Sequence, residues 1–150
     1  MSDQIRKASV EDAAAIGACM RDCFAGYIPL IQKEPQPMTL NYSDIIREQS
    51  VYVLEVGGEI AGAVTLEDGA DGFVWLDVLG VFTKHQGKGY GKKLIAFAES
   101  IVRGRGASEI RLYTNIKFEA TIELYKRLGY EVYDRRVEKG YDRLYFRKEL

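Results

Sequence analysis

The spacing of apolar residues changes along the chain, and these changes predict where helices and strands lie. Gln4–Ala8 is predicted to be a short first strand, and the apolar spacing between Ser9 and Phe24 is that of a helix with one buried face. Ser9 and Asp12 resemble a capping box at the start of this helix, with Asp12 in place of the usual Glu. Ala25–Thr39 contains all three prolines and has no clear period, which predicts a long irregular connection.

The middle of the chain is predicted to be rich in strands. A short helix over about Tyr42–Gln49 is followed by two predicted strands, Val51–Val56 and Glu59–Leu66, joined by a Gly-Gly dipeptide typical of a two-residue hairpin. Phe73–Phe82 is nearly continuous apolar sequence, which suits a central strand buried on both faces.

The last part of the chain alternates helices with strands. The predicted helices are Gly87–Arg103 and Phe118–Leu128, and the predicted strands are Glu109–Thr114, Tyr130–Arg136 and Tyr141–Lys148. The predicted order is β-α-α-β-β-β-α-β-α-β-β, an α/β (α+β) fold with a mixed sheet and helices on its faces. A length of 150 residues suits one domain, residues 1–150, with a single core.

Composition narrows the classes of function. The net charge is −1 and charges of both signs are mixed along the chain, which disfavours a nucleic acid partner. No uninterrupted apolar run is long enough for a membrane span and the start lacks a signal peptide's apolar core, so we expect a cytoplasmic protein without a membrane partner. Cys19 and Cys23 are predicted to be buried thiols; the alternative, half of a metal site, lacks a second Cys or His pair, so no metal is predicted.

The segment between the buried strand and the next helix carries the clearest chemistry. Glycines at Gly87, Gly89 and Gly91 remove the Cβ atoms that would keep a ligand away from the backbone. Because the helix is predicted to begin here, its first N–H groups lack internal partners and, with the helix dipole, form an anion site. Positive charge comes from Lys88, Lys92 and Lys93. A diphosphate is the predicted guest; the alternative is a glycine-rich helix start that binds nothing.

The glycine spacing distinguishes between classes of diphosphate site. A Walker loop is absent, and the dinucleotide fingerprint Gly-x-Gly-x-x-Gly would need a glycine at Lys92 if it began at Gly87. The pattern that fits is Gln-x-x-Gly-x-Gly, at Gln86, Gly89 and Gly91.

These residues resemble the signature of the GCN5-related N-acetyltransferase (GNAT) superfamily, Gln/Arg-x-x-Gly-x-Gly/Ala after a buried strand. A second match is Leu124-Tyr125-x-x-Leu128-Gly129-Tyr130, which is similar to the family's Leu-Tyr-x-x-x-Gly-Phe segment. With the order of elements, the resemblance covers essentially the whole chain. It implies a GNAT-like acyl-CoA N-acyltransferase fold with a V-shaped opening in the sheet beside Phe73–Phe82.

The resemblance also implies acetyl-CoA or coenzyme A as co-substrate. Its pantetheine arm would pair with strand backbone near Leu79 and Val81, and Gln86 would support the loop or a phosphate. The N–H groups that would hold the pyrophosphate are those of Gly87, Lys88, Gly89, Tyr90, Gly91 and Lys92. Many members have asparagine where this chain has Phe118; the nearby asparagine is Asn115, which either contacts the cofactor or is an ordinary helix cap.

Two residues are candidates for catalysis. Tyr125 resembles the family's general acid at the leaving sulfur; a phenol with a pKa of about 10 is protonated at neutral pH, but Tyr125 also lies on a helical core stripe. Asp77 is the only acid within the buried strand and is a candidate base or a salt-bridged structural acid, with Glu67 as the other candidate. The period-two rule predicts that Asp77 shares a face with Leu79 and Val81. His85 is expected to be exposed and to face phosphate.

The acceptor is expected between Ala25–Thr39 and the last hairpin. Tyrosine and arginine alternate on the last predicted strand, at Tyr141, Arg143, Tyr145 and Arg147. This tyrosine-arginine face would bind an acidic or aromatic substrate or another subunit, or it would be solvated. The favoured reaction transfers an acetyl group to the primary amine of a small molecule by direct attack. A protein or peptide N-acetyltransferase is the first alternative, and a non-catalytic acyl-CoA sensor is the second. Members of the family are commonly dimers, so a homodimer is an expectation.

Overall fold

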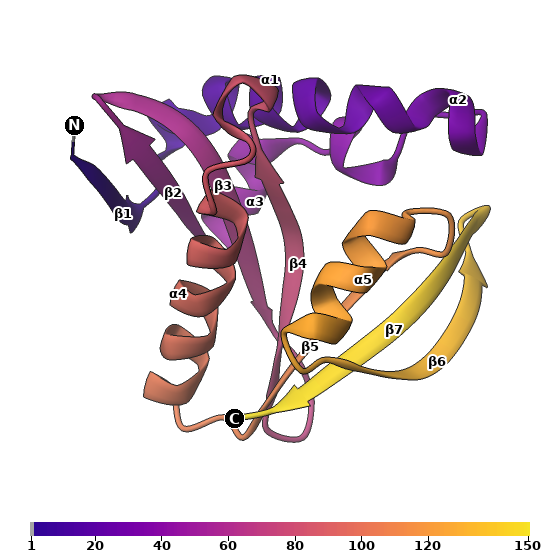
Figure 1. The fold of residues 1–150 in the computed structure, drawn as a ribbon. Coiled ribbons are helices and arrows are strands. Elements are labelled where there is room, and N and C mark those ends of the chain that lie inside the picture. Colours follow the sequence, from indigo (N-terminus) through magenta and orange to yellow (C-terminus); the bar gives the residue numbers. More distant parts are fainter. Residues whose placement is uncertain (1) are drawn as a thin grey trace.

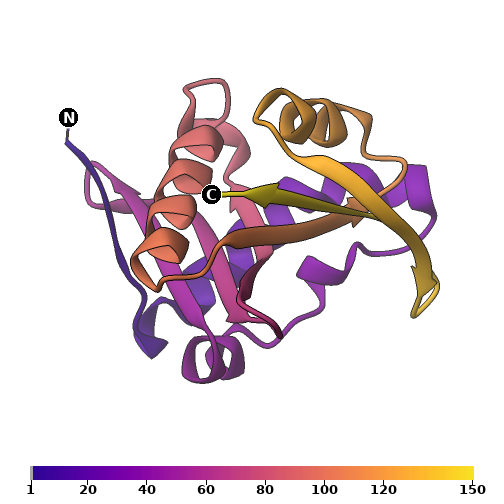
Figure 2. The same ribbon diagram turned by 90° about the horizontal axis from the view of Figure 1, so that it is seen from below.

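The computed structural model describes residues 2–150, which form a mixed sheet of seven strands with helices on both faces (Figures 1 and 2). The strands are β1 (Asp3–Lys7), β2 (Ser50–Val56), β3 (Glu59–Asp68), β4 (Phe73–Val81), β5 (Glu109–Asn115), β6 (Glu131–Glu138) and β7 (Tyr141–Glu149). Their order in the sheet is β1-β2-β3-β4-β5-β7-β6. β4 and β5 pair in parallel, whereas the other neighbours pair antiparallel.

The helices follow the predicted order with one addition. They are α1 (Ala13–Phe24), α2 (Ile28–Ile31), α3 (Tyr42–Glu48), α4 (Tyr90–Gly104) and α5 (Glu119–Arg127), with 3-10 turns η1 (Val10–Asp12), η2 (Ala25–Tyr27), η3 (Gln36–Met38) and η4 (Thr83–His85). The predicted irregular segment is therefore mostly helical turns. Prolines stand in the first turns of α2 and η3, where a missing N–H costs no hydrogen bond, so the prolines do not break these helices.

The predicted capping box is confirmed, although it opens the 3-10 turn η1 and not α1 itself. The Ser9 N–H donates to Asp12 Oδ2 at 2.8 Å. The Arg6 guanidinium also donates to Asp12 and, as the largest cause, lowers the pKa of that carboxyl to about 2.

The sheet separates two hydrophobic clusters. On one face, α4 and α5 cover a cluster that includes Leu94, Ile122 and Phe146; on the other, α1 and α3 cover a cluster that includes Ile16 and Val53. Figure 2 shows α4 and α5 on the same side of the sheet. The two-sided burial predicted for the fourth strand follows from these two layers.

The strand β4 contains a β-bulge at Asp77. Thr65 of β3 lies opposite Val78 and Leu66 lies opposite Leu76, so Asp77 has no opposing residue. The Val78 N–H donates instead to the hydroxyl of the fully buried Thr65 at 3.0 Å. As a result the alternation of faces shifts by one residue along β4.

The sheet opens between β4 and β5. The two strands pair only at Phe73↔Glu109, Val74↔Ile110 and Trp75↔Arg111. Beyond Trp75 they diverge, and Figure 1 shows β5, β7 and α5 leaning away from β4. This confirms the V-shaped opening that the resemblance implied.

One helical stretch, Val10–Ile31, is long and apolar enough by length and composition to cross a membrane. The sequence has no uninterrupted apolar run of this length. The helical stretch is longer because η1, α1, η2 and α2 follow one another without a break. Ile16 and Met20 in its α1 part are fully buried and pack in the cluster beneath the sheet. The core helices of globular proteins can have the same length and apolar composition, so this stretch is only weak evidence for a membrane span.

The close approach of β3 and β4 beside the opening predicts an effect on stability. A Cβ added at Gly62 would lie 2.8 Å from the Gly80 carbonyl oxygen and 3.1 Å from Leu94 Cδ1. Gly62→Ala should therefore lower the free energy of unfolding by about 1–3 kcal/mol. Gly104→Ala is the control, because a Cβ there meets nothing within 4 Å. Urea unfolding of both variants checks this, and equal stabilities would contradict it.

Candidate active site

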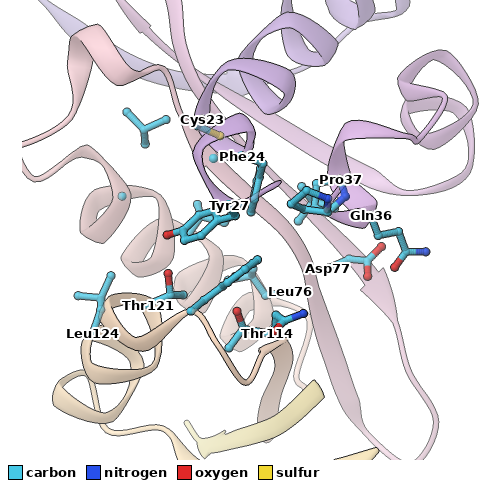
Figure 3. Close-up of a pocket in the computed structure, with 18 of the residues that line it drawn as sticks. Cys23, Phe24, Tyr27, Gln36, Pro37, Leu76, Asp77, Thr114, Thr121 and Leu124 are labelled. Atoms are coloured by element: carbon cyan, nitrogen blue, oxygen red, sulfur yellow. The ribbon is translucent and has the colours of Figure 1, made fainter. Parts of the chain in front are cut away.

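A continuous cavity of about 500 Å³ occupies the opening between β4 and β5. It begins at the loop Gly87–Gly91, follows β4 past Val81 and Leu79, and reaches Asp77 and Arg143 at its other end. Figure 3 shows Tyr27 and Thr121 around its middle and Asp77 to one side of them, near Gln36. The cavity therefore joins the two regions to which the sequence assigned chemistry.

The glycine loop forms one end of the cavity and presents free backbone donors. The helix α4 begins at Tyr90, three residues later than predicted, because Gly87 and Gly89 adopt left-handed φ angles of 80° and 82° that no helix accommodates. Within residues 2–150, the N–H groups of residues 87–92 have no hydrogen-bond acceptor. A Cβ at any of the three glycines would meet nothing within 4 Å, so the space above these donors is open.

Contacts of nearby side chains fix the loop. The Gln86 amide donates to the Val81 carbonyl at 3.0 Å, so it supports the loop as one of the two predicted roles. Lys93 pairs with Asp3 at 2.6 Å and does not add to the positive charge of the anion site as predicted. Lys88 and Lys92 are exposed and remain near it.

His85 is not exposed as the sequence predicted. Its side chain is 12% exposed and lines the cavity beside the loop. Both of its ring nitrogens are buried and lack a hydrogen-bond partner within the described chain; the nearest carboxylate, that of Glu59, lies 4.0 Å from Nε2. The turn η4 folds the residue inward, which the apolar pattern could not indicate.

Tyr125 of α5 is buried in the wall of the cavity. Its ring packs on Tyr130 and Phe146, with ring centroids 5.7 and 5.9 Å apart, so the predicted core position and the predicted cavity position coincide. Burial, and next the nearby Tyr27, raise the pKa of Tyr125 above its usual range. The phenol therefore stays protonated at neutral pH and can donate a proton.

Tyr27, within the segment Ala25–Thr39, presents a hydroxyl to the cavity. Its ring stacks on Phe118 with centroids 3.9 Å apart, and Figure 3 shows the hydroxyl pointing into the space next to Thr121. The turn η2, which the sequence pattern did not predict, brings it there.

Asp77 lies at the far end of the cavity but on the opposite face of β4 from Leu79 and Val81. The latter two pack with the α4 side of the sheet, and Val78 packs with the α1 side. The prediction that all three share a face was wrong, because the bulge shifts the alternation at Asp77. Leu79 and Val81 still line the cavity, so their predicted contact with a ligand stays a prediction.

The carboxylate of Asp77 is half-buried and accepts two hydrogen bonds. The Tyr113 hydroxyl donates to Oδ1 at 3.2 Å and the Gln49 amide donates to Oδ2 at 3.4 Å. The same amide donates to Glu67 Oε2 at 3.3 Å. Burial, then the negative charges of Asp77 and Glu48, raise the pKa of Glu67. Burial first, and then the negative charge of Asp77, raise the pKa of Tyr113.

Unpartnered polar atoms concentrate on the cavity. Among residues 2–150, the buried side-chain nitrogen and oxygen atoms without a partner are Gln49 Oε1 and the two nitrogens of His85. Both residues line the cavity. His85 lies near the glycine loop, and Gln49 lies at the other end beside Asp77, which we call the acidic end. Because buried polar atoms are costly when unpaired, these atoms indicate where ligand groups or water would bind.

The segment Ala25–Thr39 covers the acidic end of the cavity as a strap. Lys33 Nζ donates to the Gly140 carbonyl at 2.5 Å, and the Tyr141 hydroxyl donates to the Glu34 carbonyl at 2.7 Å. Arg143 donates to Gln36 Oε1. The strap is thus tied to the β6–β7 hairpin, and both border the cavity as the sequence predicted.

The other sequence-predicted residues have structural partners. Asn115 lines the cavity, but its side chain accepts from the Lys117 N–H at 2.9 Å and so supports the turn before α5, whose first flanking residue is Phe118. Cys19 is buried and Cys23 is half-buried at the cavity; both are free thiols.

Sequence reasoning missed Gln49 and Tyr113. For Tyr113 the sequence does contain a usable signal. It is a residue with a polar tip, between Leu112 and Thr114, in a strand predicted to lie next to the opening.

A parallel strand pair that opens, followed by a glycine loop with free N–H donors at a helix start, defines an acyltransferase type of site. A family model described as the acetyltransferase (GNAT) family matches residues 16–130, so the chain belongs to that family. The resemblance to this family and the fold that it implied are confirmed. A search of curated protein sequences found no significant match.

Solved structures share the whole fold. The PaiA N-acetyltransferase from Thermoplasma acidophilum in complex with coenzyme A has a TM-score of 0.84 at 22% identity, with 100% of each chain covered. A GNAT family acetyltransferase from Elizabethkingia anophelis with acetyl-CoA bound has 0.72 at 14%, covering 99% of this chain and 98% of that one. The ribosomal-protein-S18-alanine N-acetyltransferase from Escherichia coli has 0.76 at 16%, covering 99% and 94%.

The electrostatics at the acidic end predict a pH effect on stability. Because the pKa of Glu67 is raised in the folded chain, its contribution favours the fold at low pH and is lost as the pH rises above the unfolded value of about 4.5. Glu67→Gln should therefore raise Tm at pH 7–8 but not at pH 4. The control is the exposed Glu131→Gln. A lower Tm for Glu67→Gln than for the unaltered protein at pH 8 would contradict this.

Proposed function

We propose that the protein is an acetyl-CoA-dependent N-acetyltransferase that moves the acetyl group to the primary amine of a small molecule. The observation that carries this proposal is the single cavity that links the free N–H groups of the glycine loop, Tyr125 and the carboxylate of Asp77. A diphosphate site, a protonated phenol and a carboxylate along one path are the groups that this transfer needs.

Coenzyme A fits the loop end and the β4 edge. The pyrophosphate would accept hydrogen bonds from the free N–H groups of residues 87–92, in the open space above the glycines. The pantetheine arm would lie along the edge of β4 that β5 leaves unpaired beyond Trp75, beside Leu79 and Val81. Coenzyme A and acetyl-CoA in the two relatives named above support this assignment.

The transfer is a direct attack within a ternary complex. Asp77 accepts a proton from the bound ammonium, and the neutral amine attacks the thioester carbonyl. The new C–N bond forms as the C–S bond breaks, Tyr125 donates a proton to the leaving sulfur, and the second proton of the amine nitrogen restores the phenol. The net products are the amide, free thiol and one proton. The reaction requires no metal.

The strap favours a small acceptor over a protein. Its bonds from Lys33, Glu34 and Gln36 to the last hairpin cover the end of the cavity where the amine would enter. A protein N-terminus would need an open groove there. A non-catalytic acyl-CoA sensor would have no use for Asp77 and Tyr125 on the path of the thioester.

Removal of the phenol hydroxyl separates the enzyme from the sensor. Tyr125→Phe should lower kcat by about 10²-fold, the lower range of general acid catalysis, and should leave the Kd for coenzyme A within a factor of about two. A thiol-release assay and calorimetry measure the two effects. Tyr52→Phe, which lies outside the cavity against Phe97, is the control, and an unchanged kcat in Tyr125→Phe would exclude the general-acid role.

Two glycines with the same backbone angle test the anion site. Gly58 in the β2–β3 turn and Gly89 in the loop both have φ of 82° and open space around a Cβ. Alanine at either position should cost about 1–2 kcal/mol of stability, because the left-handed conformation disfavours a Cβ. Only Gly89→Ala should also raise the Kd for coenzyme A, by about tenfold, because the loop N–H groups lose their alignment. Equal affinities in the two variants would remove the loop from the binding site.

A further inference from the structure

Arg143 of β7 is a buried cation in the wall of the cavity. It is 7% exposed, and its guanidinium lies over the Tyr113 ring at 4.4 Å from the ring centroid. A guanidinium has five N–H donors, and burial of such a charge is costly unless it is paired. Its partners in the cavity wall therefore determine whether it is free to bind a ligand anion.

The partners of Arg143 within the chain leave most of its donors free. One N–H donates to the neutral amide oxygen of Gln36, and another forms a long ion pair with Glu138 Oε1 at 3.4 Å. That same carboxylate oxygen also accepts from the Tyr145 hydroxyl. Three of the five N–H donors thus have no partner among residues 2–150. The planar guanidinium, held against the Tyr113 ring, can therefore bind a carboxylate.

The opposite charge lies across the same tyrosine. The Tyr113 hydroxyl donates to Asp77, whereas the Tyr113 ring supports Arg143. Beside Asp77, the buried Gln49 Oε1 lacks a donor. One end of the cavity therefore offers two acceptors for an ammonium and, across one aromatic ring, a guanidinium for an anion.

We propose that the acceptor is a small amino acid, whose ammonium binds Asp77 and Gln49 Oε1 and whose carboxylate binds Arg143. This inference rests on the proposed function, and it names the class of acceptor. Because Tyr113 contacts both charged side chains, the ammonium and the carboxylate of the ligand are a few bonds apart. The reaction forms the N–C bond of an N-acetyl amino acid, breaks the C–S bond of acetyl-CoA, and releases free thiol and one proton.

A rival reading is an acceptor with two ammonium groups. The carboxylates of Asp77 and Glu67, bridged by the Gln49 amide, would favour it. A diamine leaves the free donors of Arg143 unpaired, however, and would bring a second positive charge toward that buried guanidinium. The amino acid satisfies the charges on both sides of Tyr113.

Matched amines test the proposal on the full chain. Thiol release from acetyl-CoA is measured with α- and short ω-amino acids, with the methyl ester of each, and with diamines of similar length. At least one amino acid should have a kcat/KM about tenfold or more above those of its own ester and of the diamines, the discrimination that one paired charge provides. A preferred ester or diamine overturns the proposal.

Variants of Arg143 connect this preference to the residue. In Arg143→Met, the ratio of amino acid to ester kcat/KM should fall to about one, and in Arg143→Lys, which keeps the charge without the fork, it should be intermediate. Arg147→Met is the matched control, because Arg147 is exposed on the same strand. An unchanged ratio in Arg143→Lys overturns the proposal even if Arg143→Met does not fold.

Binding distinguishes failure of this inference from failure of the proposed function. Calorimetry of the unaltered protein saturated with coenzyme A measures amino acid affinity without turnover. If coenzyme A does not bind and no amine releases thiol, the proposed function fails. If coenzyme A binds but no amino acid does, or if only other amines react, the amino acid proposal alone is overturned.

Discussion

The parallel pairing of β4 with β5 ends after three residue pairs, and the rest of the site depends on this separation. Beyond Trp75, the two strands diverge while the sheet continues on both sides through β3 and β7. The opening leaves strand-edge backbone groups of β4 without a strand partner and creates a cavity between two well-packed layers. Polar backbone groups need partners, so an extended ligand that pairs with this edge completes the sheet.

The bulge at Asp77 determines what the cavity presents at each point. Without it, Asp77 would share the face of Leu79 and Val81 beneath α4. With it, the carboxylate lies with Tyr113 and Gln49 on the other face, next to the strap. The bulge is stabilised by the buried Thr65 hydroxyl, which accepts from the displaced Val78 N–H. A single polar residue in β3 thus supports the position of the candidate base in β4.

Much of the fold and one end of the site could be predicted from the sequence. The glycine loop was recognisable because close approach of a ligand to the backbone requires glycines and a helix start leaves N–H groups free, which are local requirements. The order of strands and helices followed from local periodicity. The other end of the cavity could not be predicted, because it depends on register and on contacts distant in the chain. The bulge reverses a period-two rule, Gln49 meets Asp77 across 28 positions, and Arg143 meets Gln36 across 107.

The central claim is that coenzyme A lies in the opening between β4 and β5 with its diphosphate on the glycine loop. Hydrogen–deuterium exchange with and without coenzyme A tests this most directly. The account predicts slower exchange at the amides of residues 87–92 and along 78–81, with little change in α3. Protection confined to other segments, or no protection at saturating coenzyme A, would contradict it.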